Sequence, residues 1–133
     1  MSTIRRPIQI NAPTRAVWNA LITTEGIAGW LGSGRVDGRE GGRFVCKLAS
    51  GGEVTGIVNC WRPTAKAEVV FDKHSAAPWG GTTLTFAVAR DGKQAAVHVL
   101  HGGATLDDDA VSAPLDAQWK TWLVAVRDQL EAG

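Results

Sequence analysis

Most of the chain alternates apolar and polar residues with a period of two, the pattern of β-strands with one buried face. The runs that follow this pattern are 3–10, 43–48, 53–61, 65–71, 82–90 and 94–101. Turn sequences join several of them, including Ser50-Gly51-Gly52 and Asp91-Gly92. Strands joined by short turns pair antiparallel, so the pattern predicts a mostly antiparallel sheet of about six strands. Pro7 predicts that the first strand lies at an edge of this sheet.

Two segments instead repeat apolar residues at helical spacing. One begins near Pro13 and is followed by a second short helical turn that ends near Leu31. The other is C-terminal, and Pro114 can open it. Its apolar face consists of Leu115, Trp119, Trp122, Leu123, Val126 and Leu130. Because a stripe with two Trp must be buried, we predict one α+β domain over residues 1–133, with the sheet packed on a long C-terminal helix.

Residues 32–42 are rich in glycine and predict a connector between the second helix and the sheet. A Walker loop would end in Gly-Lys-Ser/Thr, and a dinucleotide fingerprint would lie between a strand and a helix. Gly42 leads into a strand instead, so nucleotide binding is not predicted here. We expect Asp37 and Arg39 to form an ion pair that fixes the turn before Gly41.

Charge narrows the classes of partner. The formal net charge is +1, from 14 Lys and Arg against 13 Asp and Glu, with no basic stripe for nucleic acid. No apolar run approaches the roughly 18–20 residues of a membrane span, and the N-terminus lacks the apolar core of a secretory signal. We therefore expect a cytoplasmic monomer or homodimer, with no nucleic-acid partner and no membrane span.

The two cysteines are expected to be reduced. If the turn between their strands centres on Gly51, Cys46 pairs near Gly56 and Cys60 pairs near Gly42. The two sulfur atoms then lie about 13 Å apart along the ladder, because each residue advances about 3.3 Å. A disulfide does not form at that distance, and two separated Cys make a zinc site improbable.

Several short motifs occur in an order that resembles one family, the activator of Hsp90 ATPase homologue (AHSA1-like) family. They are Ile10-x-Ala12-Pro13, Trp30 with Val36-Asp37-x-Arg39-x-Gly41-Gly42-x-Phe44, Gly56-x-Val58, and His101-x-Gly103 with Trp119 and Leu123. The family lies within the START/Bet v 1-like (SRPBCC, helix-grip) superfamily, and the resemblance covers nearly the whole chain.

The resemblance implies a curved antiparallel sheet that grips the C-terminal helix, with two short helices after the first strand. Many members have a cavity between sheet and helix. It does not imply one function, because members of the superfamily bind lipids, sterols or plant metabolites, and some are cyclases. The resemblance covers a single domain without the additional N-terminal domain of the chaperone cofactor that gave the family its name, so regulation of Hsp90 is not expected from the name alone.

Candidate catalytic groups are few. His98 and His101 are three residues apart on one strand and therefore point to opposite faces, so they form neither a dyad nor a metal site together. His101 shares the parity of Val97 and Val99 and can point towards the final helix, although a histidine at a strand end is more often bonded to backbone. No catalytic residue, metal or cofactor is predicted.

Three functional readings follow. The first is binding of an apolar or aromatic small molecule, lipid-like or polyketide-like, between the sheet and the C-terminal helix, because the chain holds six Trp and three Phe. Its predicted ligand-binding residues are Trp30, Phe44, Trp61, Phe86, His101, Trp119, Trp122 and Leu123.

The second is a cyclase or hydrolase with His101 as acid or base. The third is a protein-interaction domain, chaperone-related or stress-related, which an exposed apolar patch at Trp79 in loop 72–81 would favour.

Overall fold

A computed structural model describes residues 3–132 of the chain. The elements are β1 (Thr3–Ile10), α1 (Thr14–Ile22), α2 (Thr24–Ile27), β2 (Gly32–Val36), β3 (Arg43–Leu48), β4 (Glu53–Arg62), β5 (Lys66–Phe71), β6 (Thr83–Asp91), β7 (Gln94–Gly102), η1 (Ala104–Asp107) and α3 (Asp109–Ala132). One antiparallel sheet has the strand order β1-β7-β6-β5-β4-β3-β2. The α+β class, the long C-terminal helix and the two short helices after β1 are as predicted.

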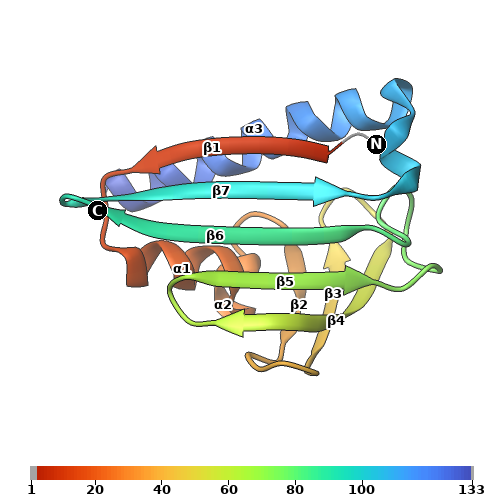
Figure 1. Ribbon diagram of the computed structural model, residues 1–133, viewed down its shortest axis with the longest axis horizontal. Coiled ribbons are helices and arrows are strands. Elements are labelled where there is room, and N and C mark those ends of the chain that lie inside the picture. Colours follow the sequence, from red (N-terminus) through yellow and green to blue (C-terminus); the bar gives the residue numbers. More distant parts are fainter. Residues whose placement is uncertain (1–2, 133) are drawn as a thin grey trace.

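The sheet curls around the helices and forms a half-barrel. In Figure 1, α3 runs along β1 and β7, α1 lies below β6, and β2 and β3 run across the direction of β5 and β6. The inward residues of the central strands alternate with exposed ones, so each strand contributes every second side chain to the core. The period-two pattern therefore predicted the buried face of each of these strands correctly.

The strand β2 corrects the sequence prediction, which made residues 32–42 a connector. Gly32–Val36 pairs with β3 at the sheet edge opposite β1, so the sheet has seven strands. None of the β2 residues is fully buried, and without a buried face there is no alternation to read. Gly34 permits the pairing, since a Cβ there would lie 1.8 Å from the carbonyl oxygen of Val45.

The glycine-rich turn after β2 has specific backbone requirements. Gly41 has φ of +80°, and a Cβ on Gly42 would lie 2.5 Å from the Asp37 carbonyl oxygen. The ion pair predicted between Asp37 and Arg39 is replaced by one with Arg35, at 3.0 Å. The Arg43 backbone N–H, followed by the two nearby guanidinium groups, holds the pKa of Asp37 below its usual value.

The β3–β4 hairpin has its predicted faces but not its predicted register. Cys46 lies opposite Val54, and Phe44 lies opposite Gly56. The turn therefore centres on Ser50 rather than on Gly51, which moves each partner by two residues and leaves the faces unchanged. Cys46 is buried, and both cysteines are free thiols.

A β-bulge in β4 decides the orientation of Trp61. The register with β5 shifts between Val58 and Cys60, and Trp61 then lies opposite the buried Ala67. A bulge adds one unpaired residue, so the residues after it change face. Strict alternation from the buried Val58 would point Trp61 outward, but after the bulge Trp61 packs against the core.

Helix α3 begins at Asp109, earlier than the predicted opening at Pro114. Asp108 caps it: the Asp108 carboxylate accepts from the Ala110 N–H at 3.0 Å, and its carbonyl accepts from two further N–H groups. Pro114 lies in the second turn and removes one helical bond, to the carbonyl of Ala110, which is exposed to solvent. The buried face is the predicted one, with Leu115, Trp119, Leu123 and Val126 facing the core.

Candidate functional site

Aromatic rings fill the space between α3 and the sheet. Trp119 is fully buried and lies within ring-contact distance of Trp30, at 5.6 Å, and of Trp122, at 5.0 Å. The cluster as a whole contains Phe44, Phe71, Trp79, Phe86, His101 and these three Trp. Most of its ring pairs are edge-to-face or tilted, as aromatic quadrupoles prefer. We call this set the aromatic cluster.

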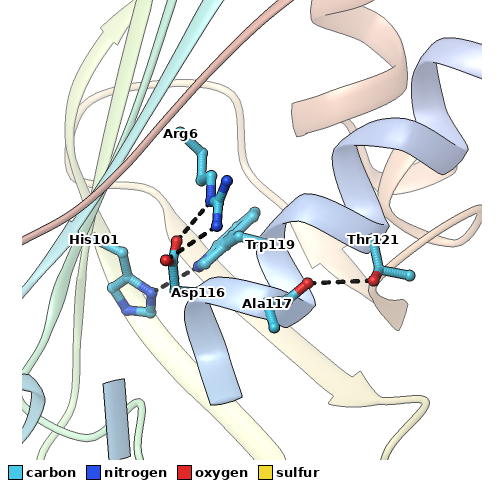
Figure 2. A network of polar contacts seen from close by, with 6 residues as sticks. All are labelled: Arg6, His101, Asp116, Ala117, Trp119 and Thr121. Atoms are coloured by element: carbon cyan, nitrogen blue, oxygen red, sulfur yellow. Dashed lines mark hydrogen bonds and ion pairs between the residues drawn. The ribbon is translucent and has the colours of Figure 1, made fainter. Parts of the chain in front are cut away.

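His101 is the polar centre of the aromatic cluster. Its Nδ1 lies 3.1 Å from the indole Nε1 of Trp119, and its Nε2 lies 2.8 Å from the hydroxyl of Thr82 (Figure 2 shows the first contact). An indole N–H only donates, so Nδ1 must accept and the proton lies on Nε2. The Thr82 hydroxyl then accepts from Nε2 and donates to the Trp79 carbonyl at 2.6 Å. The chain of bonds fixes the tautomer and ties β7 to α3.

Burial holds the His101 imidazole in its neutral form. Desolvation lowers the pKa of His101 from 6.5 to about 4. A proton on Nδ1 would also point at the Trp119 N–H, which has no lone pair to receive it. The prediction of a backbone-bonded histidine is therefore wrong, because His101 bonds to two side chains, Thr82 just before β6 and Trp119 on α3.

A hollow opens at the edge of the aromatic cluster. It has a volume of about 300 Å³ and lies between α3, the β3–β4 turn and the loop before β6. Its apolar lining includes Leu48, Pro78, Trp79, Val111, Leu115 and Trp122. Trp122 is half-buried, so part of its indole remains accessible from the hollow. Through Trp122, the aromatic cluster therefore meets solvent at the hollow.

The eight residues predicted to bind a ligand divide into three groups. Trp30, Phe86, His101, Trp119 and Trp122 make direct ring contacts with one another, and Phe44 joins them through Phe71. Leu123 lies on the buried face of α3, in the core. Trp61 is apart from the cluster and forms an edge-to-face pair with Trp18, at 5.2 Å. Trp122 alone among the eight lines the hollow.

Sequence reasoning missed Trp79. An exposed patch at Trp79 would have favoured the protein-interaction reading, but Trp79 is only 2% exposed and its ring lies 4.8 Å from the His101 ring. The segment around it folds back on the sheet. The Ala76 N–H donates to the Glu53 carbonyl, and the Phe71 N–H, before the loop, donates to the Thr82 carbonyl, after it. The residue type could have indicated this burial, because the large apolar surface of a Trp side chain favours packing in the core even from a loop.

An ion pair lies close to the aromatic cluster on the β1 side. The guanidinium of Arg6 donates to both carboxylate oxygens of Asp116, at 2.6 and 3.0 Å (Figure 2). Both side chains remain about a third exposed, at 32% and 40%. The pair connects the edge strand β1 with α3 and does not reach the hollow.

Within residues 3–132, no three His, Cys, Asp or Glu side chains gather into a group that could hold a metal ion. In the same part of the chain, no helix has the length and hydropathy needed to cross a membrane.

Solved structures share this fold over almost the whole chain. The solution structure of the Aha1 dimer from Colwellia psychrerythraea has a TM-score of 0.81 at 22% identity, with 98% of this chain and 97% of that chain covered. Protein MLL2253 from Mesorhizobium loti has a TM-score of 0.86 at 18% identity, with 98% of each chain covered. CalU16 from Micromonospora echinospora has a TM-score of 0.75 at 17% identity and covers 93% of this chain and 73% of its own.

Sequence comparison agrees with the fold. No curated protein matches the chain, but the family model described as "Activator of Hsp90 ATPase homolog 1-like protein" matches residues 11–131. That span reaches from the residue after β1 to the last turn of α3. The chain therefore belongs to the activator of Hsp90 ATPase homolog 1-like family.

Proposed function

We propose that this domain binds an apolar or aromatic small molecule between the sheet and α3, with the hollow beside Trp122 as the contact site. The observation that carries the proposal is the continuity of the hollow with the aromatic cluster, through Trp79 and Trp122. Ligand sites in proteins are concave, mainly apolar and supplied with few polar groups. The lining fits this description, with Leu48, Val111 and Leu115 around the two indoles.

The other predicted residues act behind this contact surface. Trp119 lies beneath Trp122, and Trp30 lies against both, so the three rings support the accessible indole. A rigid aromatic support reduces the side-chain entropy that ligand binding would otherwise remove. In this proposal the cluster positions Trp122, and a larger ligand displaces Trp122 to reach the rings below.

The enzyme reading has less support. A general acid or base at neutral pH needs a pKa near 7 and access to the substrate. His101 is fully buried, both ring nitrogens are engaged, and burial lowers its pKa to about 4. These properties suit a structural histidine rather than a proton-transfer group.

A protein-interaction role is the second candidate, and one observation favours it. Ile57 and Val70 lie opposite each other on the outer face of the sheet and are 37% and 40% exposed. Adjacent exposed apolar side chains mark contact surfaces more often than single ones. In this second reading the face contacts a partner protein or a second copy; the sequence predicts a monomer or homodimer, and the Colwellia relative is a dimer in solution.

The test is direct detection of a bound molecule. Native mass spectrometry of the protein as purified, followed by denaturation, identifies anything that co-purifies. An apolar compound at one equivalent would support the proposal. If none is found, a panel of lipids and aromatic compounds is titrated while the indole N–H signals of the six Trp are followed by NMR.

The Trp122→Ala variant decides whether the hollow is the site, with Trp61→Ala as the matched control. Trp61 is also half-buried and aromatic, but it lies in the separate pair with Trp18. We expect binding to be lost in the first variant and kept in the second. Equal binding by both variants, or no binding by the unmodified protein, contradicts the proposal.

A further inference from the structure

The hollow has no charged side chain in its lining. Apart from the indole N–H groups of Trp79 and Trp122, its polar side chains are Ser50, in the β3–β4 turn, and Gln118, on α3. Neither is committed to a side-chain hydrogen bond within residues 3–132, so both keep their donors and acceptors for a ligand. A buried ionic group on a ligand would find no partner of opposite charge here, and unpaired ions are costly to desolvate.

The beginning of α3 adds to this discrimination. Val111 and Pro114, from its first turns, line the hollow. Free helix N-termini attract anions, because their N–H groups point outwards and the dipole is positive there. This one already has Asp108 as its cap and Asp109 in its first turn, so intramolecular carboxylates occupy that position. An anionic ligand would meet negative charge at this side of the hollow.

The remaining lining favours flat apolar molecules. Trp122 offers part of its half-buried indole, and the buried Trp79 packs against it, with ring centroids 6.2 Å apart and an interplanar angle of 42°. Leu115, Gln118 and Trp122 lie on one face of α3, at the spacing of successive turns. A planar ring that contacts Trp122 therefore has the Gln118 amide within reach of its polar substituent.

We propose that the hollow selects uncharged aromatic molecules with one hydrogen-bonding substituent, which the Gln118 amide orients, and that it discriminates against their carboxylates. The inference rests on the proposed function and narrows its ligand class. It sets apart neutral aromatic compounds from fatty-acid anions and aromatic acids, which are of similar apolar area but carry a charge.

The test uses two ligands of nearly equal shape, 2-naphthamide and 2-naphthoate, at pH 7. Dissociation constants are measured from the NMR shift of the Trp122 indole N–H, assigned with Trp122→Phe. We expect the amide to bind at least about tenfold more tightly, since charge repulsion and desolvation act on the carboxylate alone. Equal or tighter binding of naphthoate overturns the inference and leaves the proposed function intact. Absence of binding by both ligands overturns the inference, while co-purification and the panel of lipids and aromatic compounds decide the proposed function separately.

A charge-switch variant tests the role of Gln118 separately. Gln118→Lys places a cation at the hollow, and its position is exposed, so the fold tolerates it. Ala117→Lys is the matched control: Ala117 is also exposed but lies about 100° around the helix. We expect Gln118→Lys to remove the preference for the amide and Ala117→Lys to keep it. If the two variants behave alike, Gln118 does not orient the ligand and the inference fails.

Discussion

Trp119 and Trp122 lie three residues apart on α3, yet their surroundings differ. Trp119 is fully buried, and its indole N–H donates to His101. Trp122 is half-buried, and its indole packs against the rings of Trp30, Trp79 and Trp119. The two residues thus have different environments on one helix, because Trp119 faces the core and Trp122 faces the hollow.

The burial of Trp119 and the partial exposure of Trp122 separate aromatic surface that is packed in the core from aromatic surface that a ligand can reach. Around Trp119 every polar group has a partner, and the part of the chain that the structure describes contains no buried side-chain N or O without one. Around Trp122, the side chains of Ser50 and Gln118 make no side-chain hydrogen bond within residues 3–132. In the proposed function, the aromatic cluster therefore contacts a ligand only where it reaches the hollow.

Trp119→Ala should cost the most stability. The change removes a fully buried indole and leaves Nδ1 of His101 without its donor. Core Trp→Ala substitutions cost about 3–5 kcal/mol in free energy of unfolding. Urea unfolding monitored by circular dichroism measures this loss. A loss below about 1 kcal/mol would mean that Trp119 is not part of the packed core.

Stability should fall in acid because of His101. Its pKa is 6.5 in the unfolded chain and about 4 in the folded protein, so the unfolded state takes up the proton first as the pH falls. The stabilisation is complete above pH 6.5, decreases down to about pH 4, and is constant below that value. The total is about 3 kcal/mol, at 1.36 kcal/mol per pKa unit.

The measurement for His101 is urea unfolding at a series of pH values. His101→Gln should flatten the curve in this window, whereas His98→Gln should keep its slope, because His98 is exposed on the opposite face of the strand. Equal slopes in the two variants would assign the acid sensitivity to other groups.

Trp122→Ala should change stability less than Trp119→Ala and ligand binding more. The half-buried indole loses less apolar burial, so we expect about 1–2 kcal/mol in unfolding free energy. Naphthamide binding should weaken at least about tenfold in the same variant. A stability loss as large as that of Trp119→Ala would remove the distinction between the two positions.

The smallest effect should come from Asp116→Asn, which breaks the ion pair with Arg6. Both side chains are partly exposed, and solvent-exposed pairs contribute at most about 1 kcal/mol. A double-mutant cycle with Arg6→Met, at low and high salt, isolates the pairwise coupling. Naphthamide affinity should not change, since Asp116 is outside the hollow. Loss of binding would extend the site towards β1.

The sequence alone determined the elements that have one buried face. Period-two alternation identified β3 to β7 and their inward residues, and helical spacing identified the buried stripe of α3. The parity rule also placed His98 and His101 on opposite faces. These predictions were correct because burial of one face requires apolar residues at the period of the element, and that period is visible without a partner.

The tertiary structure decided where these faces meet. The strand β2 has no buried face and left no pattern, the bulge in β4 turned Trp61 inward, and Trp79 reached the core from a loop. The hollow is lined from three segments that are distant in the chain, the β3–β4 turn, the loop after β5 and α3. Periodicity reports which side of an element is apolar but not which elements face each other. Whether Trp119 or Trp122 is accessible is therefore set by the curl of the sheet around α3 and not by their nearly identical sequence positions.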